Sequence, residues 1–383
     1  MADAPQPDLY RRSEKELRNV KTVEDLYKLD ESSSVTRVIG CGRDDSNLTK
    51  PLAEDGAVIL RNFVQRSIDR IAICALALRP LDVQSNDAHS RLRAVSCKDV
   101  TSTDSCGLPA IRPQLRKKLA KCMEEIKSNS KFPADSPVTV QTNFSSELAN
   151  YPSDDDRIAH SPSSKKRKRP ESFPLSKLRY LNLGEWNYNW GDRRYEKVPH
   201  ATALPDRLVE VARRAHELAK EQTGEAASRP VDFDMAICNF YHQSRPSDRL
   251  GGHRDDVEED LNLPLVTISL GATGVFLLGG ESRQDAPTAI LLRAGDCMVM
   301  SGRSRMYFHG VPTVLSLDGN SACQMNGNPS DNVHRVFPEL DDDGCLSEDF
   351  TGDKSMIPSL DEMEFAQAFL STVRMNLSIR QVA

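Results

Sequence analysis

The sequence predicts an α+β protein whose C-terminal half is a β-sandwich or barrel. Three observations carry this prediction. Short apolar segments follow one another between Ala236 and His309, separated by Gly, Pro and Asp, which is the spacing of an antiparallel β-architecture. An amphipathic stretch precedes them at residues 205–222. A helix signal and an alternating strand follow them after Ser359. Helices therefore flank a β core.

The expected strands are short, as in a sandwich. Each is a run of apolar and β-branched residues bounded by turn formers. They are Ala236–Tyr241, Leu263–Leu270, Gly274–Leu278, Thr288–Leu292, Cys297–Met300 and Met306–His309.

Two helices are expected beside these strands. Residues 205–222 place Leu208, Val211 and Ala215 on one stripe and end before Gly224, a common helix terminator. The last helix begins with a capping-box pattern at Ser359 to Glu362. A third amphipathic stretch, residues 112–131, has a basic outer face, which is either a solvated face or a nucleic-acid contact.

Composition divides the chain into four parts. Residues 1–50 form a polar N-terminal extension, and the first buried strand is expected at residues 57–64, where order begins. Residues 51–144 form the N-terminal helical and strand part of the main module. Residues 145–176, rich in Ser, Asp, Pro and Lys, form a disordered linker. Residues 177–383 form the core, with an acidic insertion at 322–358.

The linker carries five consecutive cations. A basic run in an accessible segment fits the acidic groove of a nuclear import receptor. The alternative is a solubilising or phosphate-contacting tail. We therefore expect a nuclear protein, also present in the cytoplasm. The five residues are Lys165, Lys166, Arg167, Lys168 and Arg169.

Composition excludes several classes of protein. The 383 residues are 38% hydrophobic and 28% charged, enough for one or two domains with a real core. The nine cysteines include no C-x-x-C pair, which favours neither a disulfide framework nor a zinc ribbon and suggests a reducing compartment. The longest apolar run, Ile71–Leu78, is too short for a membrane span. The first residues show no signal-peptide pattern, and we expect a monomer without membrane contact.

The net charge of −6 is unevenly distributed. Residues 322–362 hold ten acidic and two basic residues, a net of −8, so the rest of the chain carries +2. We interpret this stretch as a solvating surface loop, with a regulatory lid as the alternative. The overall acidity therefore does not exclude a nucleic-acid substrate.

One H-x-D sequence, His253 to Asp255, indicates a metal centre. Residues two apart on a strand or its exit point the same way, so an imidazole and a carboxylate can meet on one ion. The third ligand is His309, because His334 lies in a stretch rich in turn formers. Two His and one carboxylate leave octahedral positions open, as in Fe(II) oxygenases. The alternative for each histidine is an ordinary hydrogen-bonded residue.

The C-terminal strand, Arg374 to Val382, alternates polar and apolar residues. One face carries Arg374, Asn376, Ser378 and Arg380. The two arginines lie about 20 Å apart along the strand, and their planar guanidinium groups are suited to bracketing a small dicarboxylate. The alternative is an edge strand with a solvated charged face.

These motifs together resemble the AlkB family of Fe(II)/2-oxoglutarate dioxygenases, most of all its AlkB homologue 1 branch, over roughly residues 178–382. The resemblance implies a double-stranded β-helix (jelly roll), an Fe(II) cofactor held by His253, Asp255 and His309, and 2-oxoglutarate and O₂ as cosubstrates. It further implies that 2-oxoglutarate contacts Asn239, Tyr241, Arg374, Asn376, Ser378 and Arg380.

The resemblance also suggests where a substrate base lies. Trp186, Tyr188 and Trp190 alternate along one expected strand and match the family's nucleotide pocket, where a flipped base stacks on aromatic rings. The alternative is a core position for each ring. Arg283 matches a basic residue beside the base. Val257 departs from the bacterial member, which has a second acidic residue there.

The resemblance implies oxidative demethylation of N-methylated nucleobases, such as N6-methyladenine in DNA or N1-methyladenine in tRNA, with release of formaldehyde, succinate and CO₂. Two alternatives stay open. One is a protein (histone) demethylase or hydroxylase on the same scaffold. The other is a catalytically silent nuclear protein that binds nucleic acid through residues 165–169.

Overall fold

The structure is a computed structural model of residues 1–383. It describes residues 7–29, 33–40, 46–79, 81–83, 100–103, 109–111, 137–140, 173–174, 178–199, 201–224, 230–242, 245, 247–315, 335–340 and 357–383. The expected helix at 112–131 and the basic run at 165–169 lie outside these residues.

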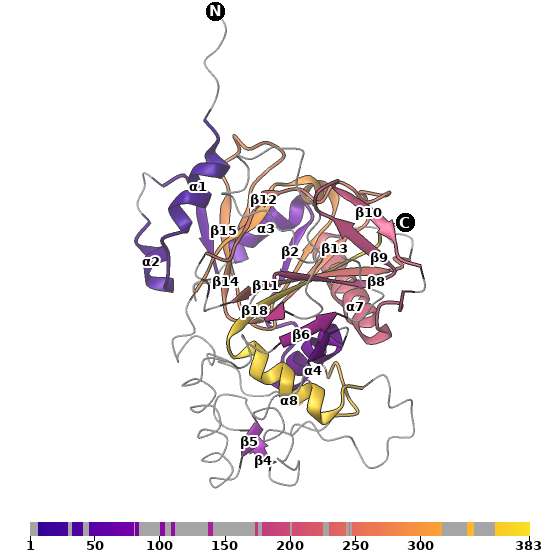
Figure 1. The fold of residues 1–383 in the computed structure, drawn as a ribbon. Helices are drawn as coiled ribbons and strands as arrows, with labels where there is room; N and C mark the ends of the chain where they lie inside the picture. Colours follow the sequence, from indigo (N-terminus) through magenta and orange to yellow (C-terminus); the bar gives the residue numbers. More distant parts are fainter. Residues whose placement is uncertain are drawn as a thin grey trace, which may run out of the picture.

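Two β-sheets face one another (Figure 1). The larger sheet has the order β2 (Ala57–Leu60), β16 (Cys297–Met300), β13 (Leu265–Gly271), β18 (Val373–Arg380), β11 (Met235–His242), β8 (Tyr180–Gly184). The smaller sheet has the order β1 (Arg37–Ile39), β15 (Thr288–Leu292), β14 (Gly274–Leu278), β17 (His309–Val314), β12 (Leu250–His253). Neighbouring strands in both sheets are antiparallel, except that β1 pairs parallel with β15. The jelly-roll prediction is confirmed.

Smaller elements surround the two sheets. A hairpin of β9 (Trp186–Asn189) and β10 (Arg194–Lys197) extends the edge near β8. Two ribbons are formed by β3 (Leu81–Val83), β6 (Pro137–Val140) and β7 (Phe173–Pro174), and by β4 (Val100–Thr103) and β5 (Pro109–Ile111). The helices are α1 (Leu9–Leu17), α2 (Val23–Tyr27), α3 (Ser46–Glu54), α4 (Ser67–Leu78), α7 (Asp206–Thr223), α8 (Leu360–Leu370) and the 3₁₀ helix η4 (Gly302–Met306). No helix among the described residues is long and apolar enough to cross a membrane.

The smaller sheet is buried on both faces, because successive strand residues point to opposite sides. On β14, Phe276 and Leu278 pack into the sandwich with residues of the larger sheet. Val275 and Leu277 face the other way and pack against Tyr10 and Leu17 of α1. Helix α1 therefore forms an outer layer over the smaller sheet.

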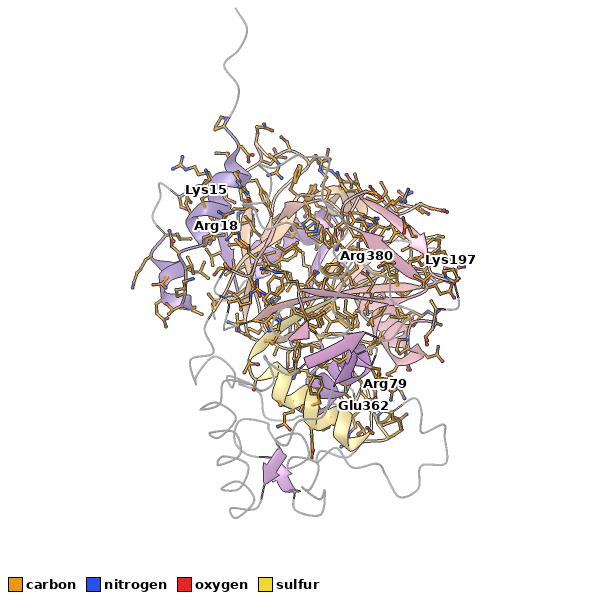
Figure 2. The ribbon with its side chains drawn as sticks, viewed as in Figure 1. Lys15, Arg18, Arg79, Lys197, Glu362 and Arg380 are labelled. Atoms are coloured by element: carbon orange, nitrogen blue, oxygen red, sulfur yellow. The ribbon has the colours of Figure 1, made fainter. Side chains whose placement is uncertain are left out.

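Helices α4, α7 and α8 cover the outer face of the larger sheet (Figure 1). Helix α4 is apolar almost throughout and lies against α8, where Arg79 and Glu362 form an ion pair of 2.9 Å (Figure 2). Helix α7 ends at Gly224 in the left-handed conformation, as its sequence predicted.

Asp69 of α4 fixes a segment of the acidic stretch. Its buried carboxylate forms a 2.6 Å ion pair with Arg66 and accepts hydrogen bonds from the backbone N–H groups of Val336 and Phe337. Val336, Phe337 and Leu340 are buried. The interpretation of the acidic stretch as a solvating loop is therefore wrong for residues 335–340, whose apolar side chains join the core.

We expect the Asp69→Ala variant to lose about 3–5 kcal/mol of unfolding free energy, because it leaves the buried Arg66 guanidinium and two backbone N–H groups without their carboxylate. Chemical denaturation measures this loss. Glu217→Ala, at an exposed position of α7, serves as the control and should change stability by less than about 0.5 kcal/mol. Equal stability of the two variants would contradict the anchoring role.

Most predicted elements of the core are confirmed. Strands at Gly274–Leu278, Thr288–Leu292 and Cys297–Met300 have the predicted bounds. The capping box at Ser359 and Glu362 is present, and the C-terminal strand is central in its sheet and fully buried, which removes the alternative of a solvated edge strand.

Two further predictions are wrong. Residues 306–309 are not a strand: η4 ends at Met306, and His309 begins β17. Order does not begin at residue 57, because α1, α2 and β1 precede it and bury Tyr10, Leu17 and Ile39. The polar extension is therefore part of the packed fold, since its few apolar residues lie on one helical face.

Candidate metal centre

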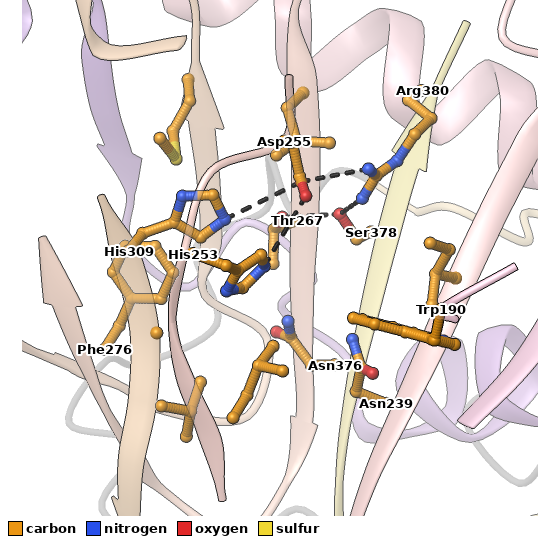
Figure 3. Close-up of a pocket in the computed structure, with 16 residues that line it drawn as sticks. Trp190, Asn239, His253, Asp255, Thr267, Phe276, His309, Asn376, Ser378 and Arg380 are labelled. Atoms are coloured by element: carbon orange, nitrogen blue, oxygen red, sulfur yellow. Dashed lines mark hydrogen bonds and ion pairs between the residues drawn. The ribbon is translucent and has the colours of Figure 1, made fainter. Parts of the chain in front are cut away.

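Two neighbouring strands of the smaller sheet, β12 and β17, bring His253, Asp255 and His309 together. His253 ends β12 and His309 begins β17, and the two residues are opposite partners in the β12–β17 ladder. Asp255 follows two residues after His253, where the chain leaves the strand. One ligand atom from each side chain lies within 4.8 Å of the others (Figure 3). This is the spacing of atoms that share one metal ion.

Backbone carbonyls orient both imidazoles. His253 Nδ1 lies 2.9 Å from the carbonyl oxygen of Gly251, and His309 Nδ1 lies 3.1 Å from that of Tyr307. A carbonyl only accepts, so each Nδ1 carries the proton and each Nε2 keeps a free lone pair. These Nε2 atoms lie 3.6 Å and 3.8 Å from the Asp255 carboxylate. The tautomers therefore suit metal binding.

The electrostatic environment favours the protonation states in which these side chains bind a metal ion. Burial, with the neighbouring His253, lowers the pKa of His309 to about 4, so its imidazole is neutral at pH 7. Burial alone would raise the pKa of Asp255, but Arg380 and the two imidazoles outweigh it and the net shift is downward. A neutral imidazole and an ionised carboxylate are the forms that bind a metal.

A buried ionic network supports Asp255. Arg380 Nη1 lies 3.0 Å from Asp255 and 2.8 Å from Glu258. Arg305 of η4 donates to the backbone carbonyl of Asp255 and pairs with Glu258 at 2.8 Å. Tyr195 donates to Glu258 at 2.7 Å. Arg305 and Glu258 were not predicted from the sequence, because nothing in a charge-rich segment distinguishes a buried ion pair from an exposed one.

A pocket between the two sheets opens onto the three metal-ligand candidates. About 460 Å³ of space lies between its lining residues, including solvent at its mouth. Asn239 and Asn376 line it from neighbouring strands, and Trp190 lies at one side (Figure 3). The lining residues are Trp190, Ile237, Asn239, Leu250, His253, Asp255, Leu265, Thr267, Phe276, Met300, His309, Gly310, Val311, Asn376, Ser378 and Arg380.

A family model decides the identity of this site. The model described as the 2OG-Fe(II) oxygenase superfamily matches residues 139–380, more than half of the chain. The chain belongs to the 2OG-Fe(II) oxygenase superfamily. The family's name states its cofactors, Fe(II) and 2-oxoglutarate, and His253, Asp255 and His309 form the candidate iron site.

Three relatives are similar to this chain. "DNA N(6)-methyladenine demethylase ALKBH1A" of Arabidopsis thaliana is 33% identical over 212 residues, 55% of this chain and 50% of that protein. "Nucleic acid dioxygenase ALKBH1" of Homo sapiens is 33% identical over 222 residues, 56% and 49% of the two chains. "tRNA demethylase abh1" of Schizosaccharomyces pombe is 37% identical over 144 residues, 36% and 43%. The chain spans about half the length of these relatives. Their names confirm the predicted AlkB homologue 1 branch.

The structure fits an iron ion and a dicarboxylate cosubstrate of this superfamily. Two imidazole nitrogens and a carboxylate are suitable donors for iron. Arg374 is completely buried and donates to the carbonyls of Ala272 and Leu292 and to the Ser269 hydroxyl. Among the described residues no carboxylate lies within ion-pair distance of Arg374, and its Nε has no hydrogen-bond partner.

The Tyr241 hydroxyl is the second unpaired group of this region. Tyr241 is the opposite partner of Arg374 in the β11–β18 ladder, and its buried hydroxyl has no hydrogen-bond partner among the described residues. The Asn376 Oδ1 is unpaired in the same way. A buried guanidinium with no carboxylate partner and an unpaired Nε, beside an unpaired buried hydroxyl, suits a carboxylate ligand. Neither Arg374 nor Tyr241 lines the pocket, so their contact with the distal carboxylate of 2-oxoglutarate stays a prediction.

Of the residues predicted to bind the substrate base, only some lie near the pocket. Trp190 lines the pocket and contacts Tyr188 edge to face, with ring centroids 4.8 Å apart. Trp186 points elsewhere, because its indole N–H donates to Asp234 at 3.0 Å. Arg283 does not line the pocket: it donates to the carbonyl of Gly252 at 2.8 Å and lies over the Phe308 ring.

Proposed function

We propose that this protein is an Fe(II)/2-oxoglutarate-dependent dioxygenase that demethylates N-methylated nucleobases in DNA or RNA, N6-methyladenine in DNA or N1-methyladenine in tRNA. The observation that carries the proposal is the His253, Asp255 and His309 cluster, which shares one pocket with the Trp190 ring. The names of the relatives, two demethylases and a nucleic acid dioxygenase, support a nucleic-acid substrate.

The overall reaction balances without another reductant. Iron and 2-oxoglutarate, when bound, supply the oxidising power to insert oxygen into a C–H bond. One oxygen atom of O₂ leaves in succinate, together with CO₂, and the other becomes the hydroxyl of the N-methyl group. The C–N bond then breaks, the base nitrogen regains a proton, and formaldehyde leaves.

The protein's own residues position the reactants. Arg374 and Tyr241 would hold the distal carboxylate, and Asn239 and Asn376 line the pocket that contains the metal-ligand candidates. Arg380 holds Asp255 in place through its 3.0 Å ion pair. Trp190 would stack on a base that has been flipped out of a helix or lies in a single strand.

A panel of methylated DNA and RNA oligonucleotides, with and without 2-oxoglutarate, tests the proposal by mass spectrometry of the bases. We expect 2-oxoglutarate-dependent loss of methyl groups, and about a ten-fold or larger drop in kcat/KM for Trp190→Ala, because stacking contributes about 1–3 kcal/mol per base. Trp186→Phe, at a ring that binds Asp234 and does not line the pocket, is the control and should keep wild-type kcat/KM.

The alternatives give different outcomes in the same assay. Demethylation of methylated peptides but of no oligonucleotide would indicate the protein demethylase or hydroxylase. Oligonucleotide binding without succinate formation would indicate a catalytically silent protein that binds nucleic acid. Unchanged oligonucleotide turnover in Trp190→Ala would contradict the stacking role.

We further propose that the protein works in the nucleus and also in the cytoplasm, and that an import receptor binds residues 165–169. The five consecutive cations support this proposal. The expectation of a monomer stays a prediction.

A further inference from the structure

We propose that Glu14 of the N-terminal helix and Arg283 are positioning residues for the metal ligand His253, and that they act by holding the backbone of Gly252. The inference rests on the proposed function, because it assumes that His253 binds the metal. It gives helix α1 a role in metal binding, and it gives Arg283 a role other than contact with a substrate base.

The strand that ends at His253 is only partly paired with its neighbouring strand. Strand β12 pairs with β17 at Leu250 and at His253, but its register shifts between these two residues. A register shift interrupts the ladder, so the backbone between the paired residues loses regular strand partners. Gly251 and Gly252 lie in this gap, and glycine adds no side chain that restricts the backbone. The residue before His253 is therefore not fixed by the sheet.

Two charged side chains supply the missing contacts. The N–H of Gly252 donates to the Glu14 carboxylate over 2.6 Å. The carbonyl of Gly252 accepts from Arg283 Nη2 over 2.8 Å. Both backbone polar groups of Gly252, the residue before His253, are thus bound by charged side chains, which form stronger hydrogen bonds than neutral ones.

These contacts bear directly on the imidazole. The neighbouring carbonyl of Gly251 accepts from His253 Nδ1 at 2.9 Å and so sets the direction of Nε2. A rotation of the backbone at Gly252 would move this carbonyl and the ring together. Groups that orient a metal-bound histidine typically change metal affinity about 10–100-fold when removed.

Helix α1 packs closely against the smaller sheet, and this packing fixes the position of Glu14. Tyr10 is fully buried and donates to the carbonyl of Leu277 at 2.9 Å. A Cβ at Gly252 or at Gly279 would overlap the Tyr10 ring, so the helix lies directly on the metal-binding strand. The Glu14 side chain is itself only 3% exposed. Its position is set by packing rather than by solvent.

The contact between Tyr10 and Leu277 offers a matched control. Tyr10→Phe keeps the ring on Gly252 but removes the hydroxyl bond that fixes α1 to β14. It weakens helix docking without touching either hydrogen bond of Gly252. A merely structural role of α1 would make Tyr10→Phe and Glu14→Ala alike in metal affinity, whereas a positioning role separates them.

The test is a titration of the purified full chain with Co(II) alone, followed by the visible absorption of the bound ion. We expect Glu14→Ala and Arg283→Met each to raise the Co(II) Kd about ten-fold or more and to alter the absorption bands. Glu14→Gln keeps a side-chain oxygen acceptor for Gly252 and should stay within about three-fold of wild type. Tyr10→Phe should lower the unfolding temperature but keep the wild-type Kd and spectrum.

Each of these measurements either supports or contradicts the positioning role of Glu14 and Arg283. The double variant Glu14→Ala/Arg283→Met should show less than the product of the two single effects, because both act on one residue. A wild-type Kd in Glu14→Ala, or an equal loss in Tyr10→Phe, would overturn the positioning role. If Glu14→Ala does not fold, Arg283→Met and Glu14→Gln carry the test. Failure of the wild-type chain to bind Co(II) would instead overturn the metal centre itself, and this inference with it.

Discussion

Alanine in place of Asp255 or of His253 should abolish bound iron and lower 2-oxoglutarate turnover at least about 10³-fold, which is about 4 kcal/mol of transition-state stabilisation. Each change removes one of the three side chains whose ligand atoms lie within 4.8 Å of one another. Asp255→Ala also leaves the buried Arg380 without one of its two carboxylate partners. Iron content by mass spectrometry and succinate formation measure the two losses.

Asp256→Ala is the matched control for this prediction. Asp256 is the next carboxylate along the chain, but it pairs with the exposed Arg193 and does not line the pocket. It should keep iron and wild-type turnover. Wild-type turnover that continues after rigorous removal of iron would contradict the assignment of the metal centre.

Arg374→Lys should raise the KM for 2-oxoglutarate about 100-fold, a loss of about 2.7 kcal/mol, while the metal affinity stays near that of wild type. Lysine keeps the positive charge but has no planar fork, so it cannot hold a carboxylate and also donate to Ser269, Ala272 and Leu292 as Arg374 does. Steady-state kinetics at varied 2-oxoglutarate and a Co(II) titration separate the two quantities.

Tyr241→Phe tests the same carboxylate position with a smaller change. It removes only the unpaired hydroxyl next to Arg374 and should raise the KM for 2-oxoglutarate about ten-fold, since one hydrogen bond to a charged group contributes about 1.5 kcal/mol. Parallel loss of metal affinity and cosubstrate affinity in Arg374→Lys would indicate misfolding and would remove the support for this role.

The sequence allowed prediction of those strands whose ends carry strong signals. Gly274–Leu278 follows a glycine-containing turn and ends before Gly279, and Cys297–Met300 follows Gly295, whose φ of +90° requires glycine. The clustering of the candidate metal ligands was predictable for a related reason. An H-x-D at a strand exit and a later histidine need only the two-residue period of a strand to place their side chains.

Other features depend on contacts that the sequence does not encode locally. Residues 306–309 are apolar enough for a strand, but a short apolar run does not distinguish a strand from a 3₁₀ turn, and Tyr307 N–H bonds back to Ser304. Helix α1 has only nine residues, three of them basic or acidic in its first six, and its burial depends on β14 and β12, over 230 residues away. Glu14 and Glu258 were not predicted, because their roles depend on contacts with residues far away in the sequence.

The opposition of His253 and His309 in one ladder has a consequence for folding. A slip of β12 by one residue against β17 would turn the His253 side chain to the outer face of the sheet and leave most of the fold intact. Such a molecule would be compact, stable and unable to hold iron. Only the native pairing places both imidazoles together, so a bound metal ion would stabilise this register, and we expect iron supplied during synthesis to raise the yield of active protein.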